Sequence, residues 1–149
     1  MLRVRFIYYI LIFLFSAAIA YSQDSKDDIR DKIEKIKLEK MVKKMDLDDA
    51  TAETFKEKYK TFSETIRGLN QKRAKTYILM TQNIEGGSGL DSLVDQVIAL
   101  ENEINQQRIS FVTDLKSILT SKQIAQMIVF ERKFNIELKK LLKEYRKRQ

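Results

Sequence analysis

The chain has 149 residues, enough for one domain, and 28 Lys and Arg against 21 Asp and Glu give it a net charge of +7. It contains no Cys, His, Pro or Trp, and three of its four glycines, Gly86, Gly87 and Gly89, fall within four residues. The missing Cys and His exclude disulfides, thiol or imidazole catalysis, and the usual zinc, copper, haem and iron–sulfur sites. So few helix-breaking residues predict long helices around one turn.

The first 22 residues have the three parts of a secretory signal peptide. Arg3 and Arg5 precede ten uninterrupted apolar residues, 6–15, and a segment of small and apolar residues follows. The whole apolar stretch, residues 6–20, would be about 22 Å long as a helix, which is shorter than the ~30 Å hydrocarbon core of a membrane. We therefore expect export and cleavage, after Ser22 or after Ala20, which leaves a single domain over residues 23–149. A retained membrane anchor is the alternative.

The positive charge of the exported chain is concentrated at its end. Without the two signal-peptide arginines the net charge is +5, and the last eleven residues also sum to +5. The rest is therefore neutral overall, which argues against the extended basic face of a nucleic-acid-binding protein. This basic end suits the negative pole of a helix dipole, or contact with an anionic membrane or an acidic partner. Its residues are Lys139, Lys140, Lys143, Arg146, Lys147 and Arg148.

Apolar residues recur with a helical period of about 3.6 along the whole exported chain. They predict helices over about 25–45, from the N-cap Asp48 to about residue 85, from an N-cap at Asp91 or Ser92 to Leu119, and from Thr120 onwards. The glycines form a short tip that returns the third helix antiparallel to the second. No nucleotide-binding glycine motif is present. The expected fold is all-α, an elongated four-helix hairpin with three long helices and a shorter first one.

The segment Leu119-Thr120-Ser121-Lys122-Gln123 predicts the start of the last helix. The Thr120 hydroxyl is placed to accept from the main chain of Gln123, while the Gln123 side chain reaches back to the Thr120 N–H. This reciprocal arrangement is a capping box. Leu119, just before the cap, is expected to pack against Ile124 or a neighbour.

An L-T-x-x-Q motif opening the last long helix of a small, exported, all-α chain resembles the LTxxQ-motif, Spy/CpxP-like periplasmic proteins. Those proteins carry two copies, and the earlier slot here begins with Leu47 and Asp48. It departs from the pattern because Asp48 stands in place of Thr, and Thr51 in place of Gln. The spacing of Glu131, Phe134 and Leu138, with I-x-x-x-K-L-E-K-M in the first helix, resembles the Bacteroidetes branch identified as sensors of ECF-type sigma factors.

The resemblance implies a bent helical hairpin in the periplasm that pairs as a homodimer. It implies either inhibitory sensing in an envelope stress response, with an anti-sigma or sensor protein as partner, or ATP-independent holding of unfolded proteins. Some relatives bind metal through His-rich ends. Because this chain has no His, we expect no metal and no other cofactor.

Two arginines interrupt the apolar seams of the middle helices. Counting residues outward from the glycine tip places Arg73 level with Glu101 or Glu103. Counting from the turn near Leu119 places Arg108 level with Glu131, which predicts a partly buried ion pair. The alternative is that both arginines lay their stems on the seam and keep their charged heads in water.

No catalytic constellation occurs in the sequence: S-x-x-K and G-x-S-x-G motifs are absent. The expected activity is therefore protein binding and not enzymatic, either as a stress sensor or as a chaperone. Aromatic residues at helical spacing are expected first to lie in the core. If the layer is only two helices thick, some of them are expected instead to line an exposed surface that binds a partner. The candidates for that surface are Phe55, Tyr59, Phe62, Phe130 and Phe134.

Overall fold

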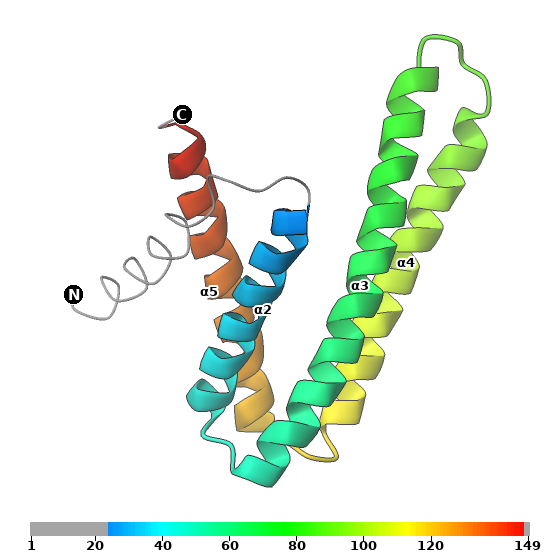
Figure 1. Cartoon of the computed structure of the whole chain (residues 1–149). Helices are drawn as coiled ribbons and strands as arrows, with labels where there is room; N and C mark the ends of the chain where they lie inside the picture. The colour runs from blue at the N-terminus through cyan, green and yellow to red at the C-terminus, as the bar shows by residue number, and fades with distance from the viewer. Residues whose placement is uncertain (1–23, 148–149) are drawn as a thin grey trace. The chain divides into compact units, whose positions relative to one another are not determined.

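The computed structural model describes residues 24–147, and side chains from residue 29 onwards. Within this range the chain is all-α, with four helices and no strand (Figure 1). The helices are α2 (Asp24–Met45), α3 (Asp49–Asn83), α4 (Leu90–Leu115) and α5 (Ser121–Arg146). Their number and order agree with the sequence-based prediction. The predicted signal peptide, residues 1–22, lies outside the described residues.

The chain divides into two parts, of which the first ends at Lys40 and the second begins at Met41. Within the first part the structure describes residues 24–40, which form most of α2. The second part contains the last turn of α2 and all of α3, α4 and α5. Both helix caps predicted from the sequence, at Asp48 and Thr120, belong to this second part.

Helices α3 and α4 lie side by side and antiparallel, as Figure 1 shows, and form a long hairpin. Their facing sides bury Leu69 and Thr76 of α3 against Val97, Ile104 and Phe111 of α4. These buried positions repeat every seven residues, about two helical turns, so each helix turns one stripe toward the other.

The tip of the hairpin uses glycine where the backbone needs it. Gly87 and Gly89 have φ of 66° and 70°, in the left-handed region that side chains with a Cβ seldom adopt. Gly89 is also the N-cap of α4, and its carbonyl accepts from the Leu93 N–H at 3.2 Å. The prediction of an N-cap at Asp91 or Ser92 is therefore wrong, because the left-handed glycine turns the chain into the helix before either residue is reached.

Helix α4 ends at Leu115, four residues before the predicted end at Leu119. The connecting residues form a tighter turn, in which the Ile118 N–H donates to the Leu115 carbonyl at 3.0 Å. Leu115 is fully buried and Leu119 is 6 % exposed. No Gly or Pro marks this point, and the Ser117 hydroxyl donates to the Asp114 carbonyl at 2.7 Å within the turn.

The main core of the second part lies where its helix ends meet. The largest fully buried side chains are Met41, Met45, Phe55, Leu115 and Met127. They come from the end of α2, the start of α3, the end of α4 and the start of α5. The two turns that carry the predicted cap residues therefore flank a shared apolar core.

Candidate functional site

The turn before α5 carries the capping box that the sequence predicts. The Thr120 hydroxyl oxygen accepts from the Gln123 N–H at 3.3 Å, and the Gln123 side-chain oxygen accepts from the Thr120 N–H at 2.9 Å. Leu119 and Ile124, on either side of the box, are both buried. The predicted capping roles of Thr120 and Gln123 are confirmed, and Leu119 is buried beside them.

Gln123 makes a further contact that the sequence analysis missed. Its side-chain nitrogen donates to the main-chain carbonyl oxygen of Met45 at 3.4 Å. Met45 is the last residue of α2, and the final carbonyls of a helix have no partner within it. The amide of Gln123 thus caps its own helix with one atom and reaches the end of another helix with the other. The sequence signal for this contact was the choice of Gln over Glu at the capping-box position. Both side chains can accept from the Thr120 N–H, but only the amide of Gln can also donate.

The earlier slot of the motif also forms a cap, with different chemistry. One oxygen of the Asp48 carboxylate accepts from the Thr51 N–H at 2.9 Å, and the other accepts from the Thr51 hydroxyl at 2.7 Å. These hydrogen bonds, chiefly that from the main chain of Thr51, lower the pKa of the Asp48 carboxyl. Leu47 beside it is half-buried. Although Asp48 stands where the motif has Thr, and Thr51 where it has Gln, this slot therefore still forms an N-cap.

The predicted aromatic partner surface is only partly at the surface. Phe55 is fully buried and Tyr59 is 2 % exposed, so these two are core residues and their assignment to a partner surface is wrong. Both side chains lie in the core at the junction of the helix ends. Phe62, Phe130 and Phe134 are half-buried and stay candidates. The rings of the last two stack along α5 with centroids 5.9 Å apart.

Hairpin counting gives a confirmed contact for Arg73. Its guanidinium lies 3.7 Å from the Glu101 carboxylate, which is one of the two predicted partners. The same carboxylate accepts from the Tyr77 hydroxyl at 3.3 Å.

The predicted pair of Arg108 and Glu131 stays a prediction. The Glu131 carboxylate accepts a hydrogen bond from the Tyr59 hydroxyl at 3.0 Å, and Arg108 is exposed. Glu131 of α5 therefore contacts α3, which residue counting along α4 and α5 does not indicate.

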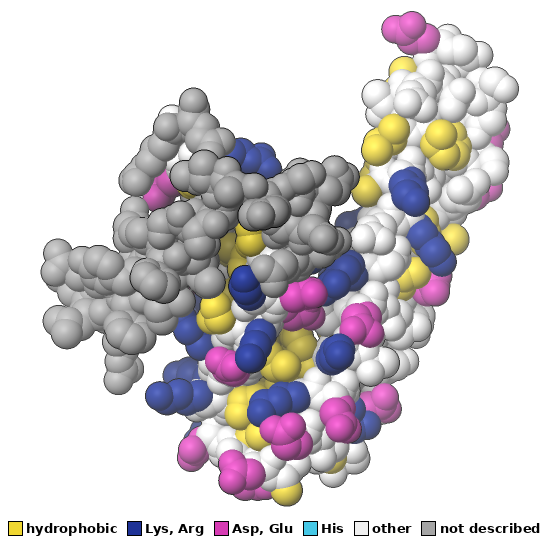
Figure 2. Space-filling model, viewed as in Figure 1, with side chains coloured by type: hydrophobic (Ala, Val, Ile, Leu, Met, Phe, Trp, Pro, Cys, Tyr) yellow, Lys and Arg dark blue, Asp and Glu magenta, His cyan; other side chains and the backbone are white. Residues whose placement is uncertain are grey.

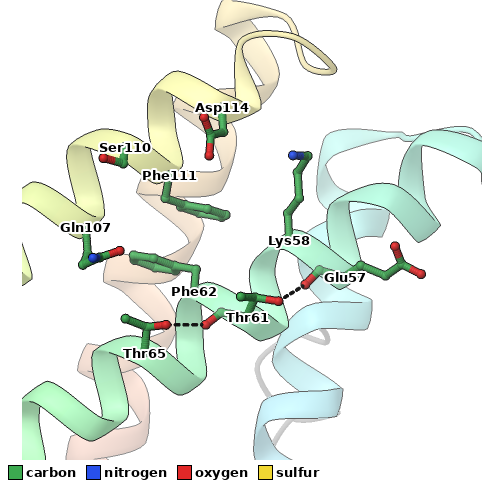
Figure 3. Close-up of a pocket in the computed structure, with 9 residues that line it drawn as sticks. All are labelled: Glu57, Lys58, Thr61, Phe62, Thr65, Gln107, Ser110, Phe111 and Asp114. Carbon is green, nitrogen blue, oxygen red and sulfur yellow. Dashed lines mark hydrogen bonds between the residues drawn. The ribbon is translucent and has the colours of Figure 1, made fainter.

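A hollow of about 350 Å³ opens between α3 and α4 near Phe62 and Phe111 (Figure 3). The two rings are nearly parallel, with centroids 4.1 Å apart and an interplanar angle of 4°. Lys58 of α3 and Asp114 of α4 stand at its edges, as Figure 3 shows. The lining offers apolar ring surface, hydrogen-bonding groups and both signs of charge. Such a lining suits a peptide segment or side chain of a partner protein.

Many large apolar side chains reach the surface of the described helices. Figure 2 shows hydrophobic side chains exposed along the α3–α4 hairpin toward its tip. Single exposed apolar residues are ordinary, whereas contiguous exposed apolar patches are typical of interaction sites. On α3 and α4 the most exposed are Tyr77, Ile78, Leu79, Ile84, Val94, Ile98 and Ile109; on α5 they are Ile128, Val129, Ile136, Leu142 and Tyr145.

The predicted basic end lies on the last turns of α5. Lys143 and Arg146 occupy the last turn of the helix, where cations complement the dipole. Lys139, Lys140 and Lys147 are exposed as well, and Arg148 lies outside the described residues.

Within residues 24–147, His, Cys, Asp and Glu side chains form no group of three or more that could hold a metal ion. None of the four described helices is long and apolar enough to cross a membrane. In comparisons with protein-family models, with curated proteins and with solved structures, the chain has no match.

Proposed function

We propose that this protein is a non-enzymatic envelope-stress protein of the periplasm, which acts as a sensor or regulator by binding a dedicated protein partner. An anti-sigma factor or another membrane-bound sensor is the partner class that the sequence resemblance suggests. The fold we propose is the elongated, Spy/CpxP-like hairpin of that family, without a metal or other cofactor.

The observation that carries this proposal is the apolar surface of α3, α4 and α5. Twelve large hydrophobic side chains on these helices are between 39 % and 67 % exposed. Apolar surface of this extent is costly to leave in water and is typical of proteins whose function is to bind others. The hollow beside Phe62 and Phe111 adds a recessed place on the hairpin for a partner residue.

Regulation through a dedicated partner is tested by deleting the gene and measuring transcription of envelope-stress genes. We expect their basal transcription to rise, and to fall again when the wild-type gene is restored. A Phe62→Glu variant, which places a charge in the hollow, should fail to restore repression although it is still exported. Unchanged transcription in the deletion strain would remove the sensor proposal.

Holding of unfolded proteins is the second candidate, because the exposed apolar residues occur on three helices and alternate with charged ones. A surface of that kind accepts many sequences. The test is aggregation of a denatured model protein with increasing amounts of the purified chain. Suppression near equimolar ratio favours a chaperone, while no suppression at large excess excludes one.

Location in the periplasm is tested separately, by fractionating cells and determining the intact mass of the exported protein. The mass of a chain that begins at Gln23 would indicate cleavage after Ser22. The mass of a chain that begins at Tyr21 would indicate cleavage after Ala20. The basic end of α5 is a further candidate contact, with anionic lipid of the membrane surface.

A further inference from the structure

Helix α5 has two opposite sides of different character. Its inner side repeats at steps of three and four residues and is buried or half-buried; it consists of Met127, Phe130, Phe134, Leu138 and Leu141. The other side, which we call the basic face, repeats at the same steps about half a turn away and is exposed along its whole length. It consists of Val129, Arg132, Ile136, Lys140, Lys143 and Lys147.

The basic face contains no acidic residue. Residues 132–147 contain seven Lys and Arg and two Glu, a net charge of +5. The two acids, Glu137 and Glu144, are seven residues apart, so they share one side of α5, roughly a quarter of a turn from the basic face. Lys139 and Arg146, which are also seven residues apart, flank the face on its other side and are exposed. Cations therefore follow this surface without an acid among them.

Two apolar side chains lie among these cations. Val129 is 53 % exposed and Ile136 is 45 % exposed. Arg132 and Lys140 stand about one turn before and one turn after Ile136. Long Lys and Arg side chains lay their carbon stems along apolar surface and keep their charged ends at the polar boundary. Exposed aliphatic side chains enclosed by such cations suit a helix that lies between lipid headgroups and acyl chains.

We propose that α5 lies along the surface of an anionic phospholipid membrane, with the basic face against the headgroups. Val129 and Ile136 enter the boundary of the acyl chains, and the Lys and Arg side chains around them contact lipid phosphates. This membrane contact goes beyond the proposed function, because a sensor and a chaperone can each act while held at a membrane. It rests on no particular protein partner.

A flat anionic surface fits the basic face better than an acidic protein does. Residues 129–147 span about 27 Å of one continuous helix, so side chains on one side of it reach a common plane. Lysine is depleted in protein–protein interfaces, whereas clusters of about four to eight Lys and Arg on one amphipathic helix are typical of binding to anionic lipid. The basic face and its flank supply Arg132, Lys139, Lys140, Lys143, Arg146 and Lys147.

The first experiment measures flotation of the purified protein with lipid vesicles. Vesicles that contain phosphatidylglycerol are compared with vesicles of phosphatidylcholine alone. The test variant, Lys140→Glu with Lys143→Glu, reverses two charges on the basic face. The matched control, Lys116→Glu with Lys122→Glu, makes the same change of net charge at exposed residues around the turn before α5. Circular dichroism verifies that each variant is helical.

We expect the wild type and the control to bind the phosphatidylglycerol vesicles, and neither to bind phosphatidylcholine alone. Each Lys or Arg close to an anionic surface strengthens binding about fivefold, so reversal of two should weaken it at least about 25-fold. About 0.5 M salt should also weaken binding, because it screens these charges.

The second experiment tests entry of Ile136 into the membrane. Because the chain contains no Cys, an Ile136→Cys variant offers one attachment point for an environment-sensitive fluorophore. We expect its emission to shift to the blue when phosphatidylglycerol vesicles are added. The matched control is Ile98→Cys on α4, a position that is 53 % exposed and lies outside the basic face. Its emission should stay unchanged.

Three results would overturn the proposal. The first is a wild-type protein that does not bind phosphatidylglycerol vesicles. The second is equal binding by the wild type and the Lys140→Glu, Lys143→Glu variant, and the third is a blue shift from position 98 without one from position 136. Retention of the wild type on polyglutamate without binding to vesicles would assign the basic face to an acidic protein instead. Transcription of stress genes is not a readout here, so failure of the membrane contact and failure of the proposed function are distinguishable.

Discussion

The hydroxyl of Tyr59 lies 3.0 Å from a carboxylate oxygen of Glu131, so a hydrogen bond joins the first half of α3 to α5. The Tyr59 ring is buried and makes a T-shaped contact with the Phe111 ring, with centroids 6.0 Å apart and an interplanar angle of 69°. Glu131 is half-buried. Residues 72 positions apart in the chain thus fix the approach of two helices that share no turn.

Replacing Tyr59 by Phe removes this hydrogen bond and leaves the aromatic packing in place. We expect the free energy of unfolding to fall by about 1 kcal/mol, the usual contribution of one such bond. Chemical denaturation followed by circular dichroism measures the change. The matched control is Tyr77→Phe, whose hydrogen bond to Glu101 is longer, at 3.3 Å, and exposed; its effect should be distinctly smaller. Equal effects from the two variants would contradict the assigned role of Tyr59.

The two roles of Gln123 can be separated by substitution. Thr120→Ala removes the side-chain cap of α5 and should reduce stability by about 1 kcal/mol. Gln123→Glu keeps an acceptor for the Thr120 N–H but cannot donate to the Met45 carbonyl when ionised. Its added charge is favourable at the start of a helix, so a loss of stability in this variant reports the contact between helices. We expect Gln123→Glu to destabilise, and Gln123→Ala to destabilise more. A Gln123→Glu variant distinctly more stable than wild type would contradict a stabilising Met45 contact.

Gly68 lies within α3 at a position that does not need glycine. A Cβ added there meets no atom within 4 Å, and α3 continues through it without interruption. Gly68→Ala should therefore raise the free energy of unfolding by about 0.5–1 kcal/mol, through lower entropy of the unfolded chain. Gly87→Ala is the matched control and should destabilise, because its φ of 66° strains a residue with a Cβ. Thermal unfolding of both variants checks the opposite signs.

Acid should weaken the start of α3 through Asp48. The pKa of its carboxyl is lowered by hydrogen bonds from Thr51, so folding favours the ionised form. That contribution is complete above the ordinary pKa of 3.8 and is lost as pH falls through the lowered folded value. The free energy of unfolding, measured between about pH 2 and 6, should decline less steeply in Asp48→Asn, which still caps but does not titrate. Identical pH profiles would contradict the prediction.

Local features of this fold follow from sequence because they depend on neighbouring residues. The cap at Asp48, the box of Thr120 and Gln123, and the glycine tip each involve residues a few positions apart. The contact of Arg73 with Glu101 was also predictable, since a short tip fixes the register of two antiparallel helices.

Features that depend on where separate helices meet did not follow from sequence. No local signal places Glu131 beside Tyr59, because the turn around Leu119 leaves the direction of α5 open. The same turn begins at Leu115, where no Gly or Pro marks the end of the helix. Phe55 and Phe62 both fit the apolar stripe of one helix, so the sequence does not distinguish them. Phe55 is buried and Phe62 only half-buried because the neighbouring helix ends cover the first and not the second.

The central claim is that the hairpin binds a dedicated protein partner. Its most direct test is in-cell photo-cross-linking from residue 61, an exposed position that lines the hollow beside Phe62. We predict a single discrete adduct with one envelope protein, lost when Phe62→Glu is introduced. Adducts with many unrelated unfolded proteins, or no adduct at all under stress and non-stress conditions, would contradict the claim.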